Sequence, residues 1–327
     1  MRPEGEYFSK YNLRVVNFTY HLNKMKKTTT PTTGEPIIIG GGPAGLTCAL
    51  QLKRYGLGSL LLEKRELGGL LWNANLVENY PGFPNGIEGS KLSRLMKKQI
   101  ERIGVDVERE EVVSVRLEKG EIIVETQNVK RKTKCLVIAS GTKSKPLPEI
   151  ISPKARKRIF TEVWPIVETT EKQIVIIGAG DAAFDYALNL AKKRNFVTIL
   201  TRGETVKCLP LLFERAAQET RIAYRAGVAV SKIEADETAD RLVVESGAKT
   251  FEADYVIFAI GRVPNLDFLS DEIRQREKEL IEMGRLYFIG DVKNELYRQV
   301  IIAAGDGLRA AMQIYARITN ETDRENG

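Results

Sequence analysis

Three glycines have the spacing that could bind a phosphate group: Gly40, Gly42 and Gly45. They follow three consecutive isoleucines, which predict a buried parallel strand, and they open onto an apolar helix that begins near Pro43 and Ala44. In a G-x-G-x-x-G turn the first glycine permits the tight bend, the second admits a pyrophosphate, and the third lets helix and strand pack closely. Since a helix N-terminus attracts anions, this stretch predicts a nucleotide-binding turn.

An acidic residue, Glu63, ends the second predicted strand at residues 59–62. A carboxylate about 20 residues beyond the glycine turn is the expected acceptor for a ribose hydroxyl. Strand, turn, helix, strand and acid together indicate a dinucleotide site. The alternatives are a glycine-rich turn in some other α/β unit and, for Glu63 alone, a solvated strand end.

A second unit of strand, glycine turn and helix follows later in the chain. Its turn has a G-x-G-x-x-A pattern that runs through the following residues: Gly178, Gly180, Asp181, Ala182 and Ala183. Two such units predict two nucleotide sites, and a chain of 327 residues is long enough for two domains.

The end of the next strand bears on the choice of coenzyme. It reads Thr201-Arg202-Gly203 and carries no acid immediately, which argues against the usual NAD carboxylate and for a partner of a 2′-phosphate. Arg202 and Lys207 are the candidates, so NADPH is favoured over NADH. A degenerate site that binds neither well is the third alternative, and Glu204 nearby is compatible with it.

The composition excludes several other chemistries. His21 is the only histidine, so neither a histidine-based triad nor a histidine metal cluster is available, and no metal site is expected. The cysteines Cys48, Cys135 and Cys208 are far apart and have no metal or redox spacing, so each reads as a small buried apolar residue. Redox chemistry must therefore come from a bound cofactor.

The distribution of charge and apolar residues limits the partners. No apolar run approaches the roughly 20 residues of a membrane helix, the N-terminus lacks a signal-peptide core, and the cysteine number is odd, so we expect a cytoplasmic protein without membrane contact. The net charge of +7 is concentrated in residues 1–34, so the body does not predict nucleic-acid binding. Three basic runs read as solvated surface or as a dock for an acidic electron carrier: 130–134, 143–145 and 154–158.

Further elements are predicted around these turns. Periodicity predicts a helix over 91–103 and strands over 112–117 and 121–125 on either side of a turn at Lys119-Gly120. The run Lys145-Pro146-Leu147-Pro148 is typical of a linker between domains.

Two stretches after Glu63 resemble the low-molecular-weight thioredoxin reductase family. Gly68-Gly69-Leu70-Leu71 is similar to its G-G-Q-L pattern, and Val77-Glu78-Asn79-Tyr80-Pro81-Gly82 to its V-E-N-x-P-G pattern. Leu70 replaces a glutamine that usually contacts the flavin. The resemblance implies FAD contacts at three positions, of which the last lies near the flavin ring: Gly69, Leu71 and Asn79.

The end of the chain carries the second strong resemblance. Gly290-Asp291, followed by Tyr297-Arg298-Gln299-Val300 and Ala303-Ala304-Gly305-Asp306-Gly307, is similar to the family's closing G-D and Y-R-Q-x-x-x-A-A-G-D-G motifs. It implies that Asp291 hydrogen-bonds the ribityl chain. It also implies that the flavin edge that gains negative charge on reduction faces Arg298, Gln299 and the helix start at Val300. The implied FAD contacts also include Gly290 and Gly141. In the family, the strand that ends at Gly141 crosses beneath the flavin.

The resemblance covers about residues 35–320 and implies a fold. It is an α/β fold of the three-layer ββα type with two Rossmann-like dinucleotide-binding domains, the NAD(P) domain being inserted into a discontinuous FAD domain. The family also implies a homodimer. Residues 1–34 read equally well as an amphipathic helix or as a tail. The expected divisions are an extension at 1–34, FAD segments at 35–146 and 256–327, and the NAD(P) domain at 147–255.

The sequence departs from the family at its chemistry. The redox-active C-x-x-C should fall on Thr161-Glu162-Val163-Trp164, so Thr161 and Trp164 occupy the cysteine positions. Disulfide exchange needs a thiolate and a resolving thiol close together, and neither is present there. Direct reduction of thioredoxin by the family's mechanism is therefore not expected. Trp164 could lie beside the flavin, in the cleft between domains or in a core.

These patterns lead to one principal hypothesis and three alternatives. The principal one is a homodimeric FAD-dependent pyridine-nucleotide oxidoreductase whose flavin is the only redox centre. The first alternative is a ferredoxin– or flavodoxin–NAD(P) reductase. The second is a non-catalytic redox sensor, or a flavoprotein reduced by another donor. The third is an enzyme at whose flavin an external thiol protein or small disulfide reacts.

Overall fold

The computed structural model describes residues 35–236 and 238–325, with side chains up to residue 320, so the predictions for residues 1–34 lie outside the described part. Two five-stranded parallel sheets organise these residues. The first sheet has the order β18-β7-β1-β2-β3, from strands Leu286–Phe288, Leu136–Ile138, Ile37–Ile39, Leu60–Leu62 and Asp106–Glu108. The second has the order β12-β11-β10-β16-β9, from strands Ile222–Arg225, Phe196–Leu200, Gln173–Ile177, Tyr255–Phe258 and Ile159–Phe160.

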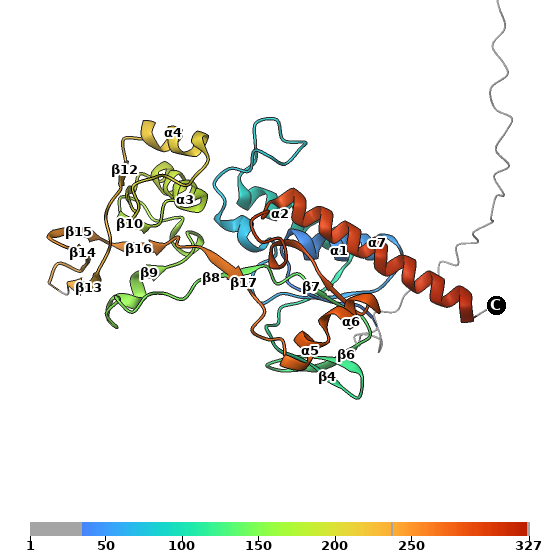
Figure 1. Ribbon diagram of the computed structural model, residues 1–327. Coiled ribbons are helices and arrows are strands. Elements are labelled where there is room, and N and C mark those ends of the chain that lie inside the picture. Colours follow the sequence, from blue (N-terminus) through green and yellow to red (C-terminus); the bar gives the residue numbers. More distant parts are fainter. Residues whose placement is uncertain (1–34, 237, 326–327) are drawn as a thin grey trace, which may run out of the picture. The chain divides into compact units, whose positions relative to one another are not determined.

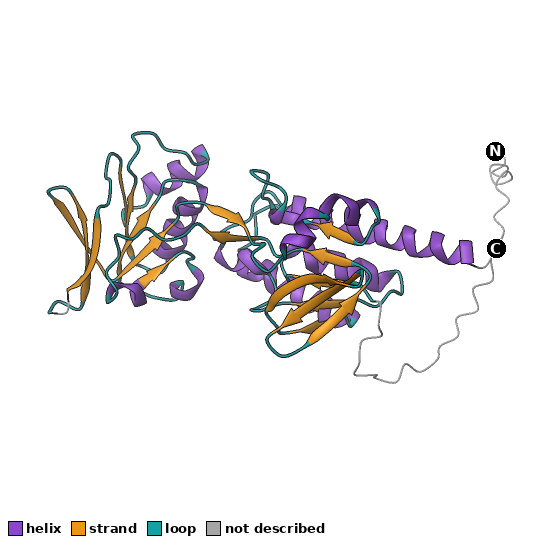
Figure 2. Cartoon of the chain, turned by 60° about the horizontal axis from the view of Figure 1, so that its bottom comes forward, coloured by secondary structure: helices purple, strands orange, loops and turns teal. Residues whose placement is uncertain are grey.

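Strands β1, β2 and β7 of the first sheet are buried on both faces, which explains why they are continuous apolar runs. Side chains of one parity, such as Ile38 and Leu61, pack against helices α1 (Pro43–Arg54), α2 (Gly89–Ile103) and α7 (Val300–Glu325). Side chains of the other parity, such as Ile39 and Leu62, pack against the antiparallel sheet of β4 (Val112–Glu118), β5 (Glu121–Thr126) and β6 (Lys130–Thr133). Figure 2 shows this layering of helices, sheet and sheet.

The second sheet repeats the plan. Ile174 and Val197 face helices α3 (Asp181–Lys192) and α4 (Pro210–Gln218). Val175 and Leu200 face the antiparallel strands β13 (Lys232–Asp236), β14 (Arg241–Ser246) and β15 (Lys249–Ala253). Both halves therefore have the three-layer ββα arrangement, and the predicted fold class is confirmed.

Two short antiparallel strands connect the halves, which we call the first and second domains after their sheets. Strand β8 (Thr142–Ser144) leaves the first domain and pairs with β17 (Arg262–Pro264), which returns to it (Figure 1). The predicted boundary at 255/256 falls inside β16, which pairs in the second sheet. After β17 come the short helices α5 (Asp271–Gln275) and α6 (Glu277–Glu282).

The elements predicted between the glycine turns are confirmed. The helix predicted over 91–103 is α2, and the two predicted strands are β4 and β5. Lys119 and Gly120 join them with φ values of 49° and 82°, as expected of a tight hairpin turn. None of the helices in the described part of the chain is long and apolar enough to cross a membrane.

The long helix α7 packs along α1 (Figure 1) and depends on one glycine for its close approach. A Cβ atom at Gly307 would lie 2.1 Å from the carbonyl oxygen of Ala44 in α1. Two turns on, Tyr315 stacks on Tyr55 with ring centroids 4.2 Å apart. Gly305 on the same helix is exposed, and a Cβ atom there would meet nothing within 4 Å.

We therefore expect Gly307→Ala and Gly305→Ala to differ in sign. The first should lower the free energy of unfolding by about 2 kcal/mol, because backbone must move to admit the methyl group. The second should raise it by up to about 1 kcal/mol, because alanine favours the helix and no atom of the same chain would lie within 4 Å of the new methyl group. Chemical denaturation of both holoproteins measures this, and equal effects would contradict the close packing of α1 and α7.

Candidate functional site

In the first glycine turn, two of the three glycines leave no room for a side chain and the one between them does. Gly40 has φ of +108°, and a Cβ atom there would lie 2.3 Å from the carbonyl oxygen of Ala139. A Cβ atom at Gly45 would lie 1.9 Å from the carbonyl oxygen of Gly40, so strand and helix touch through backbone alone. At Gly42 nothing lies within 4 Å of that position. The turn therefore leaves room at Gly42, where a pyrophosphate would approach.

Glu63 holds the same turn from the end of β2. One carboxylate oxygen accepts a 2.6 Å hydrogen bond from the amide of Gly41, and the other accepts one of 2.8 Å from the amide of Arg65. Nearby, Gly69 starts the 3₁₀ helix η1 (Gly69–Asn73), and a Cβ atom there would lie 3.2 Å from Cα of Gly42. Glu63 and Gly69 therefore both lie against the glycine turn.

Residues from distant parts of the sequence meet at the start of α7. The Asn79 side-chain amide donates a 2.8 Å hydrogen bond to Oε1 of Gln299, although 220 positions separate them. Arg298 donates from Nη1 to the carbonyl of Arg262 at 3.4 Å, while its Nε atom is buried without a partner. The structure thus brings together three of the residues for which the resemblance implied flavin contacts.

Asp291 lies in the short helix η4 (Gly290–Val292) and interacts electrostatically with Arg298. Burial raises the pKa of its carboxyl, whereas Arg298 and Arg262 act in the opposite direction. A partly desolvated carboxylate beside an arginine with an unpartnered Nε is an incomplete polar site. It fits a group that offers both hydroxyl donors and carbonyl acceptors, as the ribityl chain and ring edge of FAD do.

Asp306 supports this site and was not predicted as a functional residue. Its Oδ2 atom accepts from the amide of Gly290 at 3.1 Å and from the side chain of Asn294 at 2.8 Å, and Lys293 lies 3.4 Å from Oδ1. The signal was its place in the closing A-A-G-D-G motif. It ties the loop that carries Asp291 to α7.

The other residues of the predicted FAD set occupy supporting places. Leu71 is buried in a small core with Val77 and Leu92. A Cβ atom at Gly290 would meet the Ala44 methyl group at 2.8 Å. Pro43 begins α1, Val300 begins α7, and Gly141 has φ of +62° just before β8.

The second glycine turn reproduces the first. Gly178 has φ of +124°, and a Cβ atom there would lie 2.3 Å from the carbonyl oxygen of Ala259, just as Gly40 approaches Ala139. Ala183, at the third glycine position, is fully buried, whereas Ala182 is exposed. Asp181 accepts a 2.7 Å hydrogen bond from the amide of Leu209, which ties the start of α3 to the loop before α4.

A small basic hollow of about 230 Å³ lies beside this second turn. It brings the two predicted basic residues together with the turn, and its lining is Ala179, Gly180, Thr201, Arg202, Gly203, Thr205 and Lys207. The carboxylate of Glu204 is not part of this lining and lies beside Gly227. Two cations and two hydroxyls are suited to an anionic group such as phosphate.

The segment where the family places its disulfide lies between the two domains. Trp164 starts the 3₁₀ helix η3 (Trp164–Ile166), is 37% exposed and packs on Trp72 of η1. Of the three places expected for it, the structure therefore favours the cleft between domains over a core. Thr161 is partly buried three residues earlier.

The three cysteines are free and none lies in that segment. Cys48 is in α1 and Cys135 precedes β7, both packed with the core of the first domain, and burial raises the pKa of each thiol, to about 12 for Cys135. Burial also raises the pKa of Cys208, before α4. In the described part of the chain, no group of three or more metal-ligating side chains lies together.

The basic run at 130–134 is largely neutralised by acids on neighbouring elements, and one cation in each of the other two runs is also paired. Three pairs neutralise the first run: Lys130–Glu118 at 2.8 Å, Arg131–Glu108 at 2.5 Å and Lys132–Glu121 at 2.6 Å. In the other runs Lys143 pairs with Asp267 and Arg158 with Asp240. This favours the interpretation of the first run as solvated surface over that of a dock for an acidic protein.

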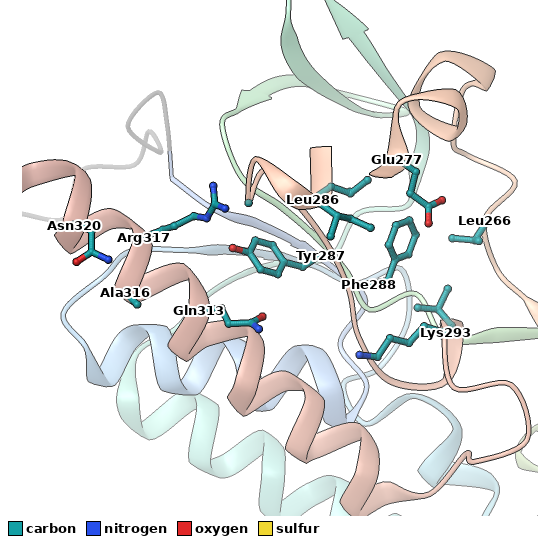
Figure 3. Close-up of a pocket in the computed structure, with 13 residues that line it drawn as sticks. Leu266, Glu277, Leu286, Tyr287, Phe288, Lys293, Gln313, Ala316, Arg317 and Asn320 are labelled. Carbon is teal, nitrogen blue, oxygen red and sulfur yellow. The ribbon is translucent and has the colours of Figure 1, made fainter. Parts of the chain in front are cut away.

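Another hollow, of about 790 Å³, lies at the edge strand β18, away from both glycine turns. Figure 3 shows Tyr287 and Phe288 of β18, Glu277 of α6, and Gln313 and Arg317 of α7 around it. Arg317 donates to carbonyl oxygens at the end of α6. None of the residues predicted to bind FAD or NAD(P) lines this hollow.

Two parallel-sheet domains, each with its own glycine turn, define a dinucleotide-binding oxidoreductase. Residues 35–316 match the family described as pyridine nucleotide-disulphide oxidoreductase, and the chain belongs to this family. As the sequence predicted, it is a thioredoxin reductase-like, FAD-dependent oxidoreductase.

The relatives cover nearly the whole chain. It is 30% identical over 292 residues to the "34.2 kDa protein in rubredoxin operon" of Clostridium pasteurianum, covering 84% of this chain and 94% of that one. It is 31% identical over 303 residues to the thioredoxin reductase of Chlamydia pneumoniae, with coverages of 84% and 96%. The structure of Lactococcus lactis thioredoxin reductase (FR conformation) matches with a TM-score of 0.75 at 24% identity, covering 88% of this chain and all of that one.

We expect Asp291→Asn to weaken FAD binding by about tenfold to about a hundredfold, because hydrogen bonds to a charged group contribute about 1.5–3 kcal/mol. Asp267→Asn is the matched control, since that carboxylate is exposed on the same domain and pairs with Lys143. The ratio of flavin to protein absorbance after dialysis measures the retained FAD. Equal retention in both variants would remove Asp291 from the site.

Proposed function

We propose that this protein passes electrons between NAD(P)H and an external acceptor through FAD alone. The observation that carries the proposal is the segment from Thr161 to Trp164, which has no cysteine, while the chain's three thiols lie elsewhere and are free. The first glycine turn nevertheless is open at Gly42, and in the second turn the atom nearest to a Cβ at Gly180 would be the Lys207 carbonyl oxygen, at 4.0 Å. A protein with two nucleotide sites and no dithiol can still use a flavin as its redox centre.

The chain's own residues would hold and tune the flavin. The glycine turn and α1 would receive the pyrophosphate, with Glu63 at the ribose and Asp291 at the ribityl chain. Arg298 and the N-terminus of α7 would stabilise negative charge at the ring edge. The hydrogen bond between Asn79 and Gln299 would hold these two side chains beside the same edge of the flavin ring. FAD supplies the capacity to accept a hydride and to release electrons singly or in pairs.

NADPH is the coenzyme that the second site supports best. The hollow beside the turn contains Arg202 and Lys207, and no carboxylate belongs to its lining. An NAD site would instead present an acid to the ribose hydroxyls. The adenosine 2′-phosphate of NADPH would occupy this hollow.

The acceptor is proposed to be a small one-electron carrier. The clostridial relative is named for a rubredoxin operon, which supports testing rubredoxin first. The paired basic run at 130–134 gives less support to an acidic ferredoxin or flavodoxin. Several relatives are named thioredoxin reductase, so a thiol protein that reacts directly at the flavin is the second candidate. The expected cytoplasmic location stays a prediction.

A homodimer is supported by one apolar face of α7. Ile301, Leu308 and Met312 are spaced by seven and four residues, so they share a helix face, and each is more than 40% exposed. In the loop before the helix, Leu296 is 92% exposed and Tyr297 74%. Exposed apolar residues that gather in this way are typical of an interface.

Met312→Glu should therefore convert the dimer to a monomer, because it would bury a charge in that contact. Lys278→Glu, which changes an exposed side chain on α6, is the control and should leave the mass unchanged. Sedimentation velocity measures both. An unchanged mass for Met312→Glu would exclude this face.

The coenzyme assignment and the activity are tested together by anaerobic titration of the FAD holoprotein with NADPH and with NADH. NADPH should bleach the flavin absorbance at the lower concentration. Arg202→Ala should raise the NADPH concentration required for bleaching by about tenfold, because one charged contact contributes about 1.4 kcal/mol. The NADH concentration required should stay unchanged. Arg225→Ala, a neighbouring exposed arginine outside the hollow, is the control.

Two outcomes would contradict the assignment. If Arg202→Ala weakened both coenzymes equally, the hollow would not bind the 2′-phosphate. If neither coenzyme bleached the flavin while dithionite did, the protein would be a redox sensor or a flavoprotein with another electron donor.

A further inference from the structure

A short segment of the first domain, residues 65–78, makes polar and aromatic contacts with the second domain. It includes η1, which begins at the Gly69 backbone packed on the FAD glycine turn. Its contacts reach the segment from Thr161 to Trp164 and also helices α3 and α4. The replaced disulfide segment is therefore part of a contact between domains.

Trp164 is attached to the first domain by its ring and by its backbone. Its indole lies on that of Trp72, with centroids 4.5 Å apart and planes at 44°, and its amide donates a 2.9 Å hydrogen bond to Oδ1 of Asn73. The first domain fixes the other half of the pair. The Trp72 ring nitrogen donates to the carbonyl of Leu67 at 2.9 Å, and the Arg94 guanidinium lies 5.5 Å from the Trp72 ring centroid.

Glu162, two residues earlier, forms the ionic part of the contact. It pairs with Arg262 at 3.2 Å and with Arg65 at 3.5 Å, and the carboxylate and Arg262 side chain are each about one-fifth exposed. Arg262 also donates to the side chain and carbonyl of Thr142. Glu162 therefore contacts the residue that joins β8 to β17, the two strands of the connection.

Two further contacts lie beyond this segment. The amide of Asn75 donates a 2.9 Å hydrogen bond to Asp185 of α3, and Lys192 donates to the Asn75 side chain at 2.6 Å. Arg215 of α4 makes two hydrogen bonds to Glu78, at 2.6 and 2.9 Å. The last pair is exposed, so water screens it. The ion pair between Glu162 and Arg262 is only about one-fifth exposed and is screened less.

We propose that the segment from Thr161 to Trp164 is an interdomain strap. Trp164 and Glu162 are positioning residues that hold the second domain against the first in one arrangement. In this chain, the place that the resembling family uses for a disulfide instead has a structural role. The strap requires neither NADPH oxidation nor a particular acceptor, so it stands apart from the proposed function.

The test is hydrogen exchange of the FAD holoprotein, followed by mass spectrometry on peptides that contain Asn75. That amide bonds to α3 and touches neither Trp164 nor Glu162, so its protection reports whether the domains stay together. Trp164→Ala should accelerate its exchange at least about tenfold. Glu162→Gln should have an intermediate effect. Leu211→Ala, on the exposed surface of α4, should leave the rate unchanged.

Unchanged exchange at Asn75 in Trp164→Ala would overturn the proposal, because Trp164 would then pack locally without holding the domains. If that variant lost FAD or failed to fold, Glu162→Gln would decide the matter by fluorescence. Trp72 and Trp164 are the only tryptophans in the chain, so the emission reports their contact directly. Emission that shifts to longer wavelength in Glu162→Gln supports the strap, and emission identical to that of the unchanged protein contradicts it.

Discussion

The structure depends on two places where backbone approaches backbone without a side chain between. At each glycine turn the first glycine touches the end of the neighbouring strand, Gly40 against Ala139 and Gly178 against Ala259. A Cβ atom at either position would collide with a carbonyl oxygen. Because this contact sets the turn, it also aims the following helix at the ligand. The two domains therefore form their glycine turns by the same backbone contact.

Local signals in the sequence were enough to predict these turns. Fully buried parallel strands appear as apolar runs, and the turns need glycines at fixed spacing, so both could be read without knowing what lies nearby. The contacts between distant residues could not. The pairing of Lys130 with Glu118 depends on strand register, and that of Trp72 with Trp164 on the placement of two domains. Nothing in the types of these residues identifies their partners.

The resemblance to thioredoxin reductases helped most where the family motifs were long and least where the sequence departs from them. It drew attention to Asp291 and Arg298, which the structure brings close together, with Nε of Arg298 unpartnered. At Thr161 and Trp164 it could show only that the family's two cysteines are missing. In the structure, Trp164 and Glu162 of this segment contact the first domain. The segment that lacks the dithiol therefore makes contacts between the domains.

FAD is proposed to be the only redox centre of this protein. Anaerobic titration of the holoprotein with dithionite tests it by counting electrons. Because FAD accepts two electrons and a disulfide accepts two more, the account predicts complete reduction at about one two-electron equivalent per FAD, with no further uptake. Uptake of about two such equivalents per FAD would reveal a second redox centre in the chain and would contradict the account.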